Sequence, residues 1–135
     1  MINGIQISDS NGIPFYTKFM QLEEEFDSTI LSGLISAIGN ISNVLFRKDV
    51  ASISFGAGEN AHEIIMISKE LHQQSRKIYF VFFTQGGVDI SYLRRMSTTL
   101  YIEAKDLLHL RTAEVNNVFH RIDNIITNQF AEIAQ

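Results

Sequence analysis

The hydrophobic and polar positions at the start of the chain predict a β-hairpin. Ile5 and Ile7 alternate with polar residues, and the alternation resumes over residues 13–19 after a polar segment. The Asn-Gly pair at 11–12 suits a tight turn between the two stretches, because both residues tolerate positive φ. Pro14 cannot donate a hydrogen bond to a neighbouring strand, so we expect the second strand to lie at an edge of its sheet.

A helix is predicted next, over residues 28–45, with Asp27 or Ser28 as its N-terminal cap. Its apolar positions recur at helical spacing: Ile30, Leu34, Ile38, Ile41 and Leu45, widened by Leu31 and Ile35. This is the pattern of an amphipathic helix, whose apolar stripe normally faces the core. The acidic residues at 23–25 suit a solvated helix entrance, where the helix dipole favours negative charge.

Three strands are predicted in the middle of the chain. Residues 51–55 alternate between apolar residues and Ser, which gives a strand with one polar face. A glycine-rich turn at 56–60 separates this strand from the next, over 62–68. Residues 78–83 are apolar at every position, and a strand without a polar face belongs at the centre of a sheet that is covered on both sides. Polar residues at 73–76 would turn the chain between these last two strands.

Two helices complete the predicted fold. Asp89 can cap a helix that runs to about residue 110, and a last helix follows Thr112. One face of the last helix carries Val115, Phe119, Ile122, Ile126, Phe130 and Ile133. The order ββαβββαα predicts an α+β fold, in which a five-stranded antiparallel sheet lies between one helix and two C-terminal helices. A chain of 135 residues is expected to form a single domain over 1–135.

Composition and charge exclude several functional classes. The formal net charge is −4, whereas nucleic-acid binding needs a basic face, so we expect no nucleic-acid partner. The absence of Cys excludes disulfides, thiolate metal sites and cysteine nucleophiles, and it is compatible with a reducing cytosol. The N-terminal residues do not resemble a signal peptide, and the longest apolar run is far shorter than the ~20 residues of a membrane span. We therefore expect a cytoplasmic protein.

One segment matches a cofactor-binding motif. Residues 56–61 read G-x-G-x-x-A after a predicted strand, as in dinucleotide-binding folds. Residues 59–75 would then form a helix, and residues 77–83 the next parallel strand. The acidic residue expected on the ribose is missing, because that strand ends in Phe83, Thr84 and Gln85. A hairpin turn at 56–60 is therefore favoured, and no cofactor is predicted.

Metal-binding and catalytic patterns are weak in this chain. Asp106/His109 and His120/Asp123 are spaced to share a helix face, but a third ligand is not evident, so we predict no metal site. The glycines at 86–87 lack the Lys-Ser or Lys-Thr of a P-loop, and the sequence has no G-x-S-x-G nucleophile elbow. We predict no catalytic residue.

Two other features are compatible with binding partners. The basic pairs at 47–48, 76–77 and 94–95 suit solvation or contact with phospholipid head groups. Small residues interrupt the first helix at Gly33, Ser36, Ala37 and Gly39, although glycine costs a helix up to ~1 kcal/mol. Small residues allow close approach, and either the underlying sheet or a second chain explains them.

The element order, carried by the segments GIQISDSNGIPFY, ILSGLISAIGNIS and IYFVFF, resembles a longin domain over essentially the whole chain. The related roadblock fold has a helix before its first hairpin, whereas this chain begins in a strand. Longin domains are non-catalytic platforms in vesicle SNAREs, adaptor complexes, tethering complexes and the signal-recognition-particle receptor, and many act with small GTPases. Since no SNARE heptad segment follows residue 135, we expect a stand-alone small subunit.

The resemblance implies that partners bind, or dimers form, through the first helix and the strand after it. Carried onto this sequence, that surface comprises Ser36, Asn40, Ser52, Ile53, Ser54 and Phe55. The strand over 51–55 has neither Lys nor Pro, so its backbone groups would be poorly guarded if it lies at a sheet edge.

Three functional hypotheses follow. The leading one is a cytoplasmic protein–protein interaction module of longin type that binds a small GTPase or a trafficking-type assembly as a homo- or heterodimer, with peripheral membrane association also compatible. The alternative is a small-molecule sensor of profilin-like type, since the abundant Phe and Ile residues could line a cavity. The third is a nucleotide-dependent enzyme built on residues 56–61.

Overall fold

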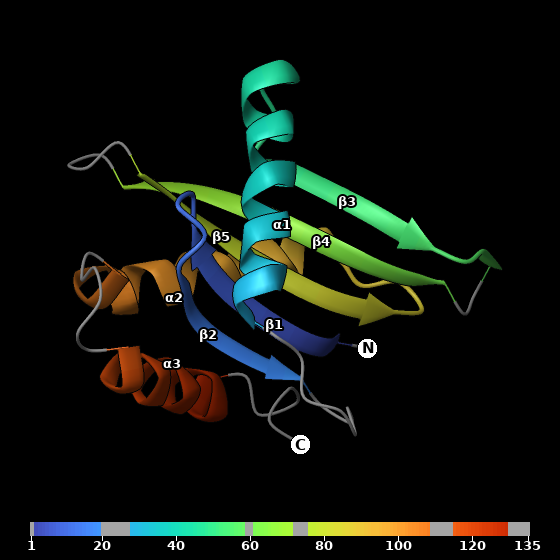
Figure 1. Ribbon diagram of the computed structural model, residues 1–135. Helices are drawn as coiled ribbons and strands as arrows, with labels where there is room; N and C mark the ends of the chain where they lie inside the picture. The colour runs from blue at the N-terminus through green and yellow to red at the C-terminus, as the bar shows by residue number, and fades with distance from the viewer. Residues whose placement is uncertain (1, 20–27, 59–60, 72–75, 109–114, 130–135) are drawn as a thin grey trace.

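The computed structural model describes residues 2–19, 28–58, 61–71, 76–108 and 115–129 (Figure 1). The elements in chain order are β1 (Ile2–Asp9), β2 (Pro14–Phe19), α1 (Ser28–Asn40), the π-helical turn η1 (Ile41–Leu45), β3 (Val50–Phe55), β4 (His62–Leu71), β5 (Arg76–Gln85), α2 (Ile90–Leu108) and α3 (Val115–Gln129). Several sequence-based predictions lie outside the described residues: the cap at Asp27, the acidic residues 23–25, the turn at 73–75, His109, Thr112, Phe130 and Ile133.

The five strands form one antiparallel sheet in the order β2-β1-β5-β4-β3. The predicted central position of residues 78–83 is confirmed, because β5 lies between β1 and β4. The predicted edge position of Pro14 is also confirmed, since β2 lies at one end of the sheet and β3 at the other. The α+β class with a five-stranded antiparallel sheet is as predicted.

Helices cover both faces of this sheet. Residues 78, 80 and 82 of β5 pack in one cluster with α2 and α3, and residues 79 and 81 pack in another with α1 (Figure 1). All five of these side chains are completely buried. Because successive side chains of a strand point to opposite faces, the strand between two helical layers must be apolar at every position.

The glycine-rich segment after β3 is a hairpin turn and not a cofactor loop. β3 and β4 are antiparallel neighbours, with Phe55 opposite His62. Gly56 and Gly58 adopt φ values of 83° and 78°, a region that L side chains rarely enter. The dinucleotide hypothesis is therefore wrong: residues 62–71 form a strand where that motif needs a helix, and β5 runs antiparallel to its neighbours.

Side-chain hydrogen bonds explain where α2 begins and where the regular α-helix of α1 ends. The Asp89 carboxylate accepts a hydrogen bond from the Ser91 backbone N–H at 2.9 Å, which confirms Asp89 as the cap of α2. The first helix departs from its prediction, because regular α-helix ends at Asn40 and the chain continues as η1. The Asn43 side-chain amide donates to the Gly39 carbonyl at 2.8 Å. That carbonyl is the acceptor an α-helix would offer to the backbone N–H of residue 43, and this competition favours the wider turn.

Candidate functional site

α1 exposes much of the apolar stripe that the sequence predicts to be buried. Ile30 and Leu45 are 71% and 70% exposed, whereas Leu31 and Ile35 are 5% and 1% exposed. The expectation that the apolar stripe faces the core holds only for Leu31, Ile35 and the half-buried Ile38, because the helix is rotated so that these residues pack on the sheet. We call the exposed side chains on α1 and η1 the outer stripe: Ile30, Leu34, Ile41 and Leu45.

Small polar residues and a glycine set this rotation. The Ser32 hydroxyl donates to the Gly12 carbonyl at 2.6 Å, and the Ser36 hydroxyl donates to the Ser10 carbonyl at 2.7 Å. Gly39 is buried against the ring of Tyr79, where a Cβ atom would lie 2.6 Å from the phenol oxygen. These contacts hold the serine and glycine face of α1 on the β1–β2 turn and the sheet, and the larger isoleucine side chains are left outside.

The two interpretations of the small residues in α1 therefore apply to different positions. Ser36 and Gly39 are explained by the underlying β-structure. Gly33 and Ala37 are exposed, and a Cβ atom added to Gly33 would meet nothing within 4 Å. These two positions, four residues apart on the outer surface, leave room for close approach by another chain.

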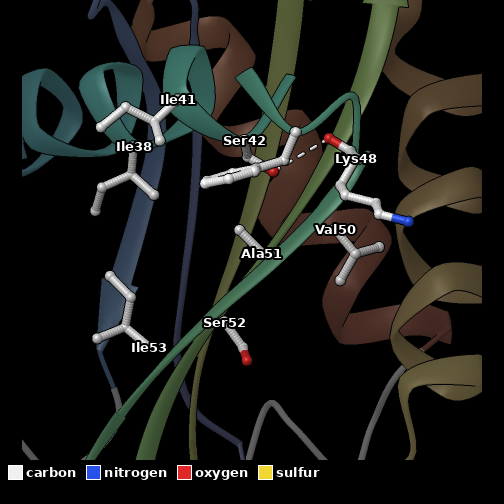
Figure 2. A pocket seen from close by; sticks show the side chains of 9 residues that line it. Ile38, Ile41, Ser42, Lys48, Val50, Ala51, Ser52 and Ile53 are labelled. Carbon is white, nitrogen blue, oxygen red and sulfur yellow. Dashed lines mark hydrogen bonds between the residues drawn. The ribbon is translucent and has the colours of Figure 1, made fainter. Parts of the chain in front are cut away.

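A surface groove of about 490 Å³ separates the end of α1 from β3 (Figure 2). Its lining is mostly apolar: Ile38, Ile41, Ser42, Phe46, Lys48, Val50, Ala51, Ser52 and Ile53. Figure 2 shows Ile38 and Ile41 on the helix, above Ala51 and Ile53 of β3, with the Lys48 ammonium pointing away from them. The Ser42 hydroxyl donates to the Lys48 carbonyl at 3.1 Å and ties η1 to the segment that leads into β3. A groove of this character can receive an apolar side chain or a small apolar ligand.

β3 borders the groove and forms the end of the sheet. Among the described strands it bonds only to β4, which leaves one row of its backbone groups without a strand partner. Ala51 and Ile53 lie opposite Met66 and Ile64, which belong to the cluster under α1. By alternation, Phe55 continues the same face, and it is largely exposed. The apolar face of the edge strand thus adjoins the groove.

Of the six residues predicted for a partner surface, two line this groove and four do not. Ser36 is half-buried and bonded to the β1–β2 turn, and Asn40 is exposed at the end of α1. Ser52 and Ile53 line the groove, and Ser54 and Phe55 are exposed beside it on β3.

Sequence reasoning missed the exposed apolar residues Ile30, Leu34, Val44, Leu45 and Phe46 as site candidates. A signal was present, because the adjacent pairs at 30–31, 34–35 and 44–45 put more apolar surface on the helix than one buried face can use.

At the opposite end of the sheet, hydrogen bonds to the charged residue Asp123 connect α3 to β2. The Asp123 carboxylate accepts hydrogen bonds from the Tyr16 hydroxyl at 2.9 Å and from the Lys18 ammonium at 3.0 Å. Burial raises the pKa of Asp123, but the two hydrogen bonds and the positive charges of Lys18 and His120 outweigh it and leave this pKa lowered. Burial, with the Asp123 charge, raises the pKa of Tyr16. These contacts join α3 to β2.

The described ranges contain no group of three or more His, Cys, Asp or Glu side chains that could hold a metal ion. Of the predicted His/Asp pairs, Asp123 is engaged by Tyr16 and Lys18 as above, and His109 lies outside the described residues. Within the part of the chain that the structure describes, no helix combines the length and the apolar character needed to cross a membrane.

Comparison with protein-family models and with curated proteins found no match to this chain.

Proposed function

We propose that this chain is a non-catalytic protein–protein interaction module of longin type. It binds a protein partner through the outer stripe of α1 and the exposed edge of β3. The observation that carries this proposal is the uneven distribution of exposed large apolar side chains. Seven of them lie on α1, η1, the residue after η1, and β3: Ile30, Leu34, Ile41, Val44, Leu45, Phe46 and Phe55. An apolar surface of this kind is typical of an interaction site, because water contact with it is unfavourable.

The edge strand supports a protein partner in particular. The free backbone groups of β3 can bond to an added strand, and the groove beside it can receive side chains from the same partner. Gly33 and Ala37 let a partner helix approach the outer stripe closely. A partner that contacts all three features buries the exposed apolar residues in one interface. The longin resemblance makes a small GTPase or a second longin-type subunit the leading candidates, in the cytoplasm.

Substitution of Leu34 or Ile53 by Asp tests this proposal. We expect either variant to weaken association roughly tenfold or more, because a charged group would be buried in the apolar centre of the interface. Self-association is measured by light scattering over a concentration series, and GTPase binding by pull-down in each nucleotide state. Ile102→Asp on α2 is the matched control, since Ile102 is also exposed and lies away from α1 and β3. A chain that stays monomeric and binds no small GTPase in either state would contradict the proposal.

A small-molecule-binding domain is the second candidate, and the groove is the observation that favours it. Its volume of about 490 Å³ lies within the range of ligand sites. The groove is at the surface between α1 and β3, whereas the sensor hypothesis places a cavity between sheet and helices. Binding of an apolar dye distinguishes the two candidates. If the groove is a ligand site, Ala51→Leu, which fills the floor of the groove, should abolish binding of the dye.

A further inference from the structure

The end of η1 and the three residues after it form a convex apolar tip with basic residues at its base. We call this feature the η1 tip: Val44, Leu45, Phe46, Arg47 and Lys48. Figure 1 shows α1 and η1 continuing past the β3 edge of the sheet before the chain returns to β3. Arg47 turns the chain back with a φ of 53°. The three apolar residues are therefore presented at one extremity of the molecule.

The apolar residues of the tip are unusually accessible. Val44, Leu45 and Phe46 are 72%, 70% and 66% exposed. Val44 and Leu45 do not line the groove beside β3. A partner held by the groove and the strand edge alone would not cover these two side chains.

The charge at the tip is positive although the whole chain is acidic. Arg47 and Lys48 are exposed, and no acidic partner of either is found within the described residues. The next residue, Asp49, is engaged by Arg94 at 3.2 Å, and the nearby Lys69 also helps to lower its pKa, after the Arg94 hydrogen bond. The carboxylate beside the tip is thus already paired, and the two tip cations remain available.

We propose that the η1 tip is a peripheral membrane-binding element for anionic bilayers. Val44, Leu45 and Phe46 enter the boundary between head groups and acyl chains, and Arg47 and Lys48 bind lipid phosphates. A membrane fits better than a second protein surface, because consecutive apolar residues on a convex tip need a deformable apolar phase to cover them on all sides. Cations directly behind such residues lie at head-group depth when the residues insert. Val44, Leu45 and Phe46 also belong to the exposed apolar surface of the proposed protein-binding function, so vesicle binding and oligomeric state are measured separately to distinguish the two occupants.

Trp fluorescence provides a direct test, because the chain has no natural Trp. The Leu45→Trp variant is mixed with two kinds of vesicle. One kind contains phosphatidylcholine alone, and the other contains phosphatidylcholine and phosphatidylserine at about 2:1. We expect a blue shift of the emission with the anionic vesicles, which added salt weakens. Ile102→Trp is the matched control, since Ile102 is 60% exposed and belongs to α2, which covers the other face of the sheet from α1. No shift for Leu45→Trp, or equal shifts for both variants, would overturn the proposal.

Vesicle co-sedimentation separates the apolar and charged contributions. Leu45→Asp is expected to reduce partitioning onto anionic vesicles roughly tenfold or more, and Ile102→Asp is not. The double variant Arg47→Gln, Lys48→Gln is also expected to lose roughly tenfold or more, with Lys105→Gln as the exposed basic control. If Leu45→Asp changes the oligomeric state and leaves vesicle binding intact, the tip is a protein contact and the membrane proposal is wrong.

Discussion

Replacing Gly39 by Leu is expected to lower the free energy of unfolding by about 3 kcal/mol, as overpacking of a well-filled interior does. The reason is the contact between Gly39 and the completely buried ring of Tyr79. A Cβ atom at Gly39 would lie 2.6 Å from the phenol oxygen and 2.7 Å from Cε1, closer than side chains approach one another. Either the ring must leave its position in the sheet layer or α1 must lift from it. Denaturant unfolding followed by circular dichroism measures the loss.

Gly33 offers a matched control in the same helix. Gly33→Leu is expected to keep stability or raise it by up to about 1 kcal/mol, because a longer side chain meets open space there and helix propensity improves. The expected changes in the free energy of unfolding have opposite signs at the two glycines. This difference separates the effect of the contact with Tyr79 from the general effect of glycine in a helix. Equal losses at both positions would show that the contact between α1 and β5 does not determine the result.

Replacing Asp123 by Ala is expected to cost about 2 kcal/mol of stability, the range for a buried polar group that loses its partner. The variant removes the acceptor shared by Tyr16 and Lys18, and Tyr16 is 2% exposed. Its hydroxyl would then be buried without the bond that it makes in the native fold. Asp49→Ala is the matched control, because the exposed Asp49–Arg94 pair contributes under about 1 kcal/mol. A loss as small as that of the control would show that the link between β2 and α3 is not important for stability.

The Asp123 link also predicts a dependence on pH. The pKa of Asp123 in the folded protein lies below its ordinary value of 3.8, so in acid the unfolded chain binds more protons than the folded one. The stabilisation by Asp123 is therefore complete above that ordinary value and is lost as the pH falls through the lowered pKa. Unfolding of the natural chain and of Asp123→Asn is compared from neutral pH into acid, and we expect their difference to shrink below about pH 4. A difference that does not change with pH would contradict this account.

Prediction from the sequence succeeded where a residue pattern admits one structural solution. The uninterrupted apolar run at 78–83 can be satisfied only between two covering layers, and β5 is the central strand. The positions of Pro14 and Asp89 also follow from local chemistry. Proline has no backbone N–H to donate to a second strand, so it belongs at a sheet edge, and the Asp89 carboxylate accepts a hydrogen bond from a backbone N–H at the start of a helix.

The longin resemblance implied a partner surface on the first helix and the following strand, and this stays a prediction. The structure places a groove between these two elements, with Ser52 and Ile53 in its lining. The outer stripe was expected to face the core. Helical periodicity identifies apolar positions on a helix, but it does not determine whether the outer stripe or the overlapping Leu31–Ile35 stripe is buried. The η1 tip was missed for a similar reason, since a predicted continuous helix over 28–45 gives no sign of a widened last turn.

The sequence by itself determined the elements, their order and the two-sided burial of the central strand, because these depend on local propensity and on the spacing of apolar residues. Only the tertiary structure decided which side of α1 faces water. That choice rests on contacts between residues distant in the chain: the Ser32 and Ser36 hydroxyls on the β1–β2 turn, and Gly39 on Tyr79. Hydrogen-bond geometry and close packing outweigh the larger apolar area of the outer stripe, and in doing so they leave that surface exposed to water.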